Sequence, residues 1–221
     1  MKIRSIRTHK GNILLILKDE VVVKRYKCGR KAVDEFKHLK SLSSLGLRVP
    51  EPYVLVGNIV VRKYIKGKNV AELLASNVKE KNSIEIDTLN YCILVTKWLE
   101  QLKNKTGLIN KDPNLRNFII NSEGDLYCVD LEDLDTGSIE QSLGYLCQNL
   151  IVLDFPLSIE KRVKICEKIV STITGAVNLD GVWYWVEKGF MEKIEIKPRL
   201  KSFFEKKLKS FKDVIRSSGY S

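Results

Sequence analysis

The stretch from Asp112 to Asp130 constrains the fold more than any other part of the sequence. It starts with Asp-Pro-Asn and places Asn117 five residues after Asp112. It continues through the apolar run Phe-Ile-Ile, a Ser-Glu-Gly-Asp segment and the apolar run Leu-Tyr-Cys-Val, which ends at Asp130. Two short apolar runs around a glycine-containing turn predict a β-hairpin. Because a hairpin returns the chain to its starting end, we expect Asn117 and Asp130 to lie together there.

This set of side chains is what phosphoryl transfer requires. One carboxylate orients the acceptor hydroxyl, while an amide and a second carboxylate hold magnesium on the nucleotide phosphates. Magnesium prefers oxygen ligands and takes few of them from a protein. We therefore interpret Asp112 as a catalytic residue, and Asn117 and Asp130 as magnesium ligands. Asp-Pro-Asn alone is also a good turn, so this interpretation depends on the order of elements in the rest of the chain.

The first third of the chain predicts strands around one helix. Apolar runs at 13–17 and 21–26 form a plausible hairpin, and 54–62 forms a second with Gly-Asn at its turn. Between them, apolar residues recur every three positions over 30–45, which is typical of a helix. The segment 66–68, Lys-Gly-Lys, is expected to be a hinge.

After this hinge the pattern becomes mostly helical. A strand-rich first part followed by helices is the order of an α+β protein with two lobes and a cleft. We predict an N-terminal lobe over 1–65 and a helical C-terminal lobe over 66–221, which contains the Asp112 loop. The helices are expected at 69–77, 84–102, 139–153, 158–173 and 198–216.

The loop residues resemble those of the protein-kinase-like superfamily. Asp112 and Asn117 match its catalytic loop, and Asp130 matches its metal-binding Asp. Within that superfamily the chain resembles small atypical bacterial branches, namely the lipopolysaccharide core heptose and Kdo kinases and the Rio-type kinases. In the lipopolysaccharide kinases the loop is similar to Asp112 through Ile119. The resemblance implies a two-lobed kinase-like fold, with ATP and Mg²⁺ as cofactors.

The resemblance extends upstream in the expected order. It implies that Val22 covers the adenine and that Lys24, on the same strand face, contacts the α- and β-phosphates. It also implies that Glu35 on the next helix pairs with Lys24. Lys63 and Tyr64 fall in a segment that resembles the hinge, where nucleotide-binding residues are expected.

Some family features are missing or changed. No G-x-G-x-x-G is present, and only Gly11 lies between the first strands. Asn110 stands where a His or Tyr is usual, and Leu131-Glu132 replaces Phe-Gly after Asp130. Such changes resemble those of the reduced branches. Glu132 and its neighbour Asp133 offer a further metal ligand or are simply solvated loop acids.

The C-terminal segment 197–216 is amphipathic and basic. It carries eight Lys or Arg and two acidic residues, which gives a net charge of +6 out of +11 for the whole chain. Three interpretations remain open: a helix packed on the C-terminal lobe, an interfacial helix on an anionic membrane, or a nucleic-acid-binding helix. The aromatic cluster at 183–185 is expected to pack between helices, or alternatively to line an acceptor groove.

The sequence as a whole predicts an ATP-dependent kinase acting on a hydroxyl group. The acceptor favoured by the resemblance is a sugar of lipopolysaccharide or another envelope glycolipid. The alternatives are an atypical protein Ser/Thr kinase of the Rio type and a nucleotide-binding pseudokinase. The beginning of the chain lacks a long apolar run, and the five cysteines are scattered. We therefore expect a cytoplasmic protein with reduced thiols, with peripheral attachment to the inner face of the cell membrane as an alternative.

Overall fold

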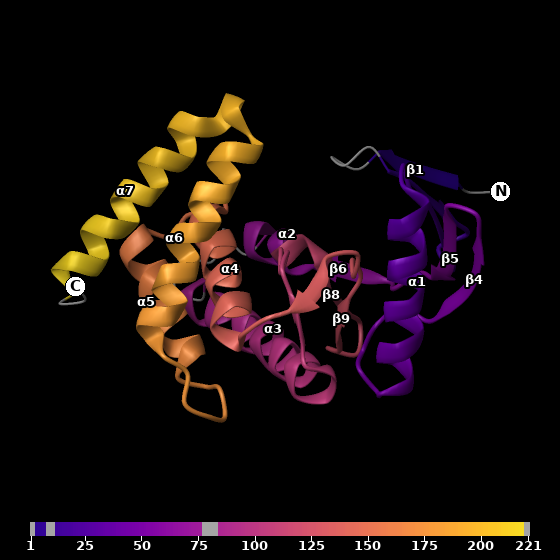
Figure 1. The fold of residues 1–221 in the computed structure, drawn as a ribbon, viewed down its shortest axis with the longest axis horizontal. Coiled ribbons are helices and arrows are strands. Elements are labelled where there is room, and N and C mark those ends of the chain that lie inside the picture. Colours follow the sequence, from indigo (N-terminus) through magenta and orange to yellow (C-terminus); the bar gives the residue numbers. More distant parts are fainter. Residues whose placement is uncertain (1–2, 8–11, 77–83, 219–221) are drawn as a thin grey trace. The chain divides into compact units, whose positions relative to one another are not determined.

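The computed structural model describes residues 3–7, 12–76 and 84–218 (Figure 1). Gly11, the glycine between the first strands, lies outside these ranges. Mixed strands and helices confirm the α+β fold class, with strands early in the chain and helices later. None of the described helices combines the length and the apolar character that crossing a membrane requires.

The chain divides into two compact units. One comprises Met1–Asn69 and Asn117–Leu134, and the other comprises Val70–Arg116 and Asp135–Ser221. The hairpin that follows the Asp112 loop thus belongs with the N-terminal strands. Asp112 itself belongs to the helical unit.

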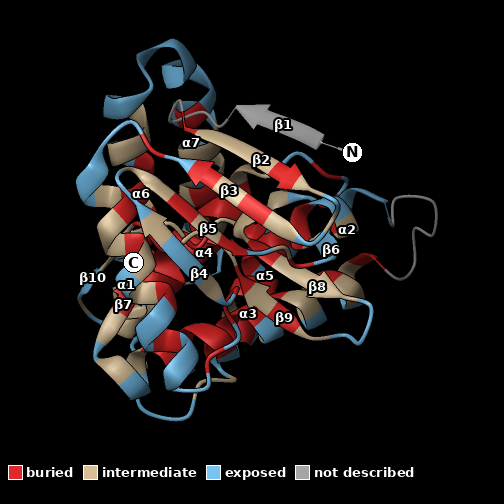
Figure 2. Cartoon of the chain, turned by 90° about the vertical axis from the view of Figure 1, so that its right-hand side faces the viewer, coloured by how far each residue is buried: buried red, intermediate tan, exposed pale blue. Residues whose placement is uncertain are grey.

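The first unit contains a five-stranded antiparallel sheet with the order β1-β2-β3-β5-β4. A two-residue turn at Gly57-Asn58 joins the last pair, and Gly57 has a φ of 57°, which glycine adopts without strain. Buried residues mark β3 at the centre of the sheet (Figure 2). The strands are β1 Ile3–Arg7, β2 Ile13–Leu17, β3 Val21–Arg25, β4 Pro52–Val56 and β5 Ile59–Lys63.

One helix, α1 Gly29–Ser44, packs against β4 and β5 of this sheet. Its buried face consists of Ala32, Glu35, Leu39 and Leu42, which recur at the three- and four-residue spacing of a helix. The core-facing row therefore includes a carboxylate among apolar side chains. That placement is costly unless the charge is compensated.

A second, three-stranded sheet has the order β6-β8-β9, with β6 Gly67–Asn69, β8 Phe118–Asn121 and β9 Leu126–Cys128. The expected hinge at 66–68 overlaps this sheet, because Gly67 and Lys68 belong to β6. Gly67 lies so close to β8 that an added Cβ would stand 2.2 Å from the carbonyl oxygen of Ile120. Glycine at position 67 therefore allows β6 to pair closely with β8, and a larger residue there would push the two strands apart.

The second unit is mainly helical. Helix α6 was not predicted from the sequence, although it packs closely on α4: a Cβ added to Gly144 would stand 2.4 Å from Cβ of Trp185. β7 Leu108–Asn110 pairs with β10 Leu134–Thr136. The helices are α2 Val70–Ser76, α3 Ile84–Thr106, α4 Ile139–Val152, α5 Ile159–Val170, α6 Leu179–Ile196 and α7 Lys201–Ser217, with short 3₁₀ turns at Leu115–Asn117 and Pro198–Leu200.

Candidate active site

Lys24 is the centre of a buried charge cluster in the first unit. Its Nζ lies 2.8 Å from Oε2 of Glu35 and 3.0 Å from Oδ1 of Asp130. The two-residue period of β3 turns Val22 and Lys24 to the same face, and both are buried. One ammonium group thus joins the central strand, the helix α1 and the segment that follows β9.

Burial and the neighbouring charges shift the protonation of this pair. Desolvation alone would lower the pKa of Lys24, but the carboxylates of Glu35 and Asp130 outweigh it and raise that pKa. Burial raises the pKa of Glu35, and the positive charges of Lys24 and Arg62 oppose that rise. The ammonium form of Lys24 is therefore strongly favoured in the folded protein.

Arg62, at the end of the predicted 54–62 hairpin, is a second buried cation beside Glu35. Its Nη2 donates a hydrogen bond to the carbonyl of Val129 at 3.0 Å, and its Nε lies 3.8 Å from Oε1 of Glu35. The pKa of Arg62 is lowered because the side chain is buried, and the adjacent carboxylate of Glu35 offsets part of that fall. The two-residue period of β5 places Arg62 on the same strand face as Val60, and both residues are buried.

Three carboxylates gather next to these cations. Glu35, Asp130 and Glu132 each offer an oxygen, and these oxygens lie within 4.8 Å of one another. Carboxylate oxygens are the ligands that magnesium prefers, so Asp130 and Glu132 fit the ion that the family resemblance implies, whereas Glu35 is paired with Lys24. Glu132 is buried, which does not fit the interpretation of a solvated loop acid.

The segment around Asp130 is held from several sides within the first unit. The backbone N–H of Val129 donates to the carbonyl of Asn117 at 2.9 Å, which brings the start of β8 next to Asp130. Nδ1 of His38 lies 2.8 Å from the carbonyl oxygen of Leu131. The structure thus brings Lys24, Glu35, Asp130 and the backbone of Asn117 together, and it adds Arg62, Glu132 and His38.

The Asp112 loop is fixed within the second unit by Asn110. The buried side chain of Asn110 accepts a hydrogen bond from the backbone N–H of Asp112 at 2.8 Å. The hydroxyl of Ser142, on α4, donates to the carbonyl of Asn110 at 3.0 Å. The backbone N–H of Asn114 donates to the carbonyl of Asp112 at 2.7 Å, which closes the turn. Asn110 therefore holds the backbone of the loop in place of the usual His or Tyr.

The other predicted residues take ordinary structural positions. Lys63 is exposed at the end of β5, and its backbone N–H donates to the carbonyl of Glu51 at 2.9 Å. The backbone N–H of Tyr64 donates to the carbonyl of Glu20 at 2.7 Å. Trp183 is buried against Phe211 of α7, with ring centroids 5.5 Å apart. The nucleotide-binding roles of Val22, Lys63 and Tyr64 stay predictions.

Comparison of the sequence with known families and proteins identifies the family of the chain. A family model described as the RIO domain matches residues 11–154, about two thirds of the chain. None of the curated proteins matches the chain by sequence.

Solved structures of phosphotransferases share the fold. In the ternary complex of streptomycin, ATP and APH(2")-IIa, the TM-score is 0.63 at 12% identity over 88% of this chain and 84% of that one. The ADP-bound aminoglycoside phosphotransferase APH(2'')-Ib gives a TM-score of 0.58 at 13% identity, with 97% and 94% covered. The choline kinase LicA from Streptococcus pneumoniae gives 0.51 at 18% identity, with 100% and 87% covered. These likenesses show a shared fold, and together with the RIO domain match they place the chain in the protein-kinase-like superfamily.

Proposed function

This chain belongs to the RIO domain family, and from that membership we propose that it transfers the γ-phosphate of ATP to a hydroxyl group. The observation that carries the proposal is the contact of Lys24 with both Glu35 and Asp130, at 2.8 and 3.0 Å. A lysine held between a helix carboxylate and a metal-binding carboxylate is the arrangement that binds nucleotide phosphates in kinase-like enzymes.

Each residue of the cluster has a distinct role in this proposal. Lys24 neutralises the α- and β-phosphates, and Glu35 holds the ammonium group in position. Asp130 and Asn117 hold magnesium, which when bound supplies positive charge to the phosphate oxygens. Glu132 is positioned to assist as a further carboxylate.

Asp112 acts on the acceptor. Its carboxylate orients the hydroxyl and accepts its proton, and Asn110 fixes the backbone from which that carboxylate extends. Catalysis of this kind is mainly positioning and charge stabilisation, so a rigid loop matters as much as the charge it presents.

For the acceptor we propose a sugar of lipopolysaccharide or another envelope glycolipid. Two observations support a sugar-like acceptor: the similarity of Asp112 through Ile119 to the loop of lipopolysaccharide kinases, and a fold shared with aminoglycoside phosphotransferases. The match to the RIO domain favours a second candidate, a protein Ser/Thr acceptor. A pseudokinase that only binds nucleotide is the third.

A transfer assay with γ-labelled ATP and Mg²⁺ tests these proposals. The full chain is incubated with a lipopolysaccharide core glycolipid, with a generic Ser/Thr protein substrate, or with no acceptor. We expect magnesium-dependent label on the glycolipid, lost in Asp130→Asn. Asp180→Asn serves as the control because it removes an exposed carboxylate at the start of α6.

The outcomes separate the candidates. Label on protein alone would replace the glycolipid by a protein acceptor. Nucleotide binding without transfer or hydrolysis would show a pseudokinase. Equal transfer by wild type and Asp130→Asn would refute the proposed site.

A further inference from the structure

The hairpin of α6 and α7 ends in a turn that carries both apolar and basic side chains. α6 stops at Ile196, a 3₁₀ turn spans Pro198–Leu200, and α7 starts at Lys201. Farther from the turn, Phe211 of α7 packs on Trp183 and Phe190 of α6, with ring centroids 5.5 and 6.5 Å apart. The hairpin is thus anchored away from its turn.

The turn exposes three large apolar side chains. Ile196 is 74% exposed, Leu200 is 47% exposed and Phe203 is 43% exposed. Leu200 and Phe203 belong to the amphipathic segment 197–216, yet among the described residues of α7 only Phe204 and Phe211 are buried. Single exposed apolar residues are ordinary, whereas three within eight residues form a patch that suggests a binding surface.

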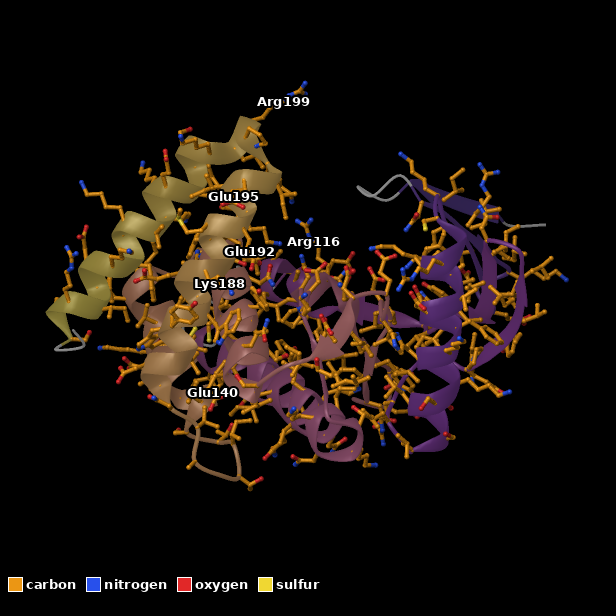
Figure 3. All side chains as sticks on the ribbon, viewed as in Figure 1. Arg116, Glu140, Lys188, Glu192, Glu195 and Arg199 are labelled. Carbon is orange, nitrogen blue, oxygen red and sulfur yellow. The ribbon has the colours of Figure 1, made fainter. Side chains whose placement is uncertain are left out.

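Basic side chains surround this patch. From Lys193 to Lys209 the sequence has seven Lys or Arg and two Glu, a net charge of +5. Arg199 extends beyond the end of the hairpin (Figure 3). Lys201 lies 3.7 Å from Glu205, and that contact joins two exposed side chains, so it neutralises little of the positive charge.

A groove between α6 and α7 repeats the same combination. It encloses about 470 Å³. Met191, Ile194 and Leu208 supply apolar lining, and the charged lining comprises four Lys or Arg and the two acidic residues Glu205 and Asp213. An acyl chain fits the apolar lining, and a phosphate fits the basic residues beside it.

We propose that this α6–α7 turn docks on an anionic lipid bilayer. Ile196, Leu200 and Phe203 would enter the acyl boundary while the surrounding Lys and Arg contact headgroup phosphates. Nucleic acid would satisfy the positive charge but gives no reason to expose an isoleucine and a leucine. The charge and the apolar patch together therefore favour lipid. Such docking would bring the protein to a membrane that holds a glycolipid.

Vesicle flotation without ATP tests the docking independently of phosphotransfer. The full chain is mixed with phosphatidylcholine vesicles, with or without phosphatidylglycerol, at low and high salt. We expect flotation only with phosphatidylglycerol, weakened at high salt. Each Lys or Arg near the surface contributes roughly a fivefold gain in partitioning, so K197Q/R199Q/K201Q should lose about 100-fold.

Two further variants make the test specific. I196S/L200S/F203S keeps the charge and should also bind less at low salt, because its apolar side chains are gone. R30Q/K37Q/K40Q removes equal charge from exposed positions on α1 and should bind like wild type.

Three outcomes would overturn the proposal. One is the absence of flotation with anionic vesicles. Another is wild-type flotation of I196S/L200S/F203S, which would mean that charge alone drives the binding. The third is a 30-nucleotide RNA that displaces the vesicles and binds that variant as tightly as wild type, which would assign the surface to nucleic acid.

Discussion

Lys24 and Asp130 lie 106 residues apart in the sequence, yet Nζ of the lysine is 3.0 Å from Oδ1 of the aspartate. The same ammonium group is 2.8 Å from Glu35, whose side chain is fully buried. The sheet, α1 and the end of the β8–β9 hairpin therefore share one electrostatic contact. We expect its removal to affect both the stability of the protein and the proposed nucleotide binding.

We expect Lys24→Met to destabilise the protein by about 3 kcal/mol at neutral pH, because Glu35 loses its nearest cation while still buried. The pKa of Glu35, already raised by burial, should rise further in this variant. A raised carboxyl pKa favours the folded state at low pH and loses that effect as the pH rises through it. The deficit relative to wild type should therefore be smaller at pH 5 than at pH 8.

Urea unfolding across this pH range measures the deficit. The double variant Lys24→Met/Glu35→Gln has no carboxyl to titrate at that position, so its deficit should change less with pH. A single-variant deficit that does not depend on pH would contradict the proposed coupling. The raised pKa of Lys24 itself acts only at strongly alkaline pH, where its stabilisation is lost.

Asp112→Ala should lower turnover by about 10²–10⁴-fold, because the variant has no group to orient the acceptor hydroxyl or accept its proton. The KM for ATP should change little, since Asp112 acts on the acceptor and not on the nucleotide. Steady-state kinetics and a thermal melt measure both effects. A large fall in melting temperature would show that Asp112 is mainly structural.

Asn110→Ala should lower kcat about tenfold and leave the KM for ATP nearly unchanged, because the loop backbone at Asp112 loses its acceptor at 2.8 Å. Asn121→Ala is a matched control: its Oδ1 accepts from the backbone N–H of Asp125 at 2.8 Å in the β8–β9 turn. Both variants should lose stability, and only Asn110→Ala should lose turnover. Equal kcat in the two would contradict the role of Asn110.

The sequence predicted most clearly those elements that local patterns specify. The hairpins of β2 with β3 and of β4 with β5 follow from apolar runs around short turns, and α1 follows from apolar residues at every third position. Local periodicity also placed Val22 and Lys24 on one face, and both are buried. The family resemblance then linked Lys24 to residues far along the chain.

Features that depend on distant contacts were missed. α6 carries Gly181 and Gly189, which weaken a helical pattern. In the structure Gly189 gives room to a ring on α4, because a Cβ added to Gly189 would stand 3.0 Å from Cδ1 of Tyr145. Arg62 was not recognised as a buried residue, because its burial depends on Glu35 and on the carbonyl of Val129. The pairing of β6 with β8 involves partners about 50 residues apart, which no local pattern reveals.

Gly67→Ala should destabilise the protein by about 1–3 kcal/mol, because the added Cβ would stand 2.2 Å from the carbonyl oxygen of Ile120. Relief requires β6 to separate from β8, the strand that starts next to Asn117. Gly29→Ala is the control, since nothing lies within 4 Å of its added Cβ. Chemical unfolding of both should show a loss at Gly67 alone. Equal stability would mean that β6 does not pair with β8 in solution.

Arg62→Met should destabilise the protein by about 3 kcal/mol, because it leaves Glu35 with one cation fewer and removes a donor to the carbonyl of Val129. Arg25→Met is the control: it removes an exposed cation from the end of β3 and should change stability by less than about 0.5 kcal/mol. Since Val129 precedes Asp130, Arg62→Met should also weaken magnesium-dependent ATP binding, measured by calorimetry on protein that remains folded. Arg62→Lys keeps the charge but not the planar group, so it should recover part of the stability. If Arg62→Met matches Arg25→Met in both measurements, Arg62 is neither a counter-ion for Glu35 nor a support for the Asp130 segment.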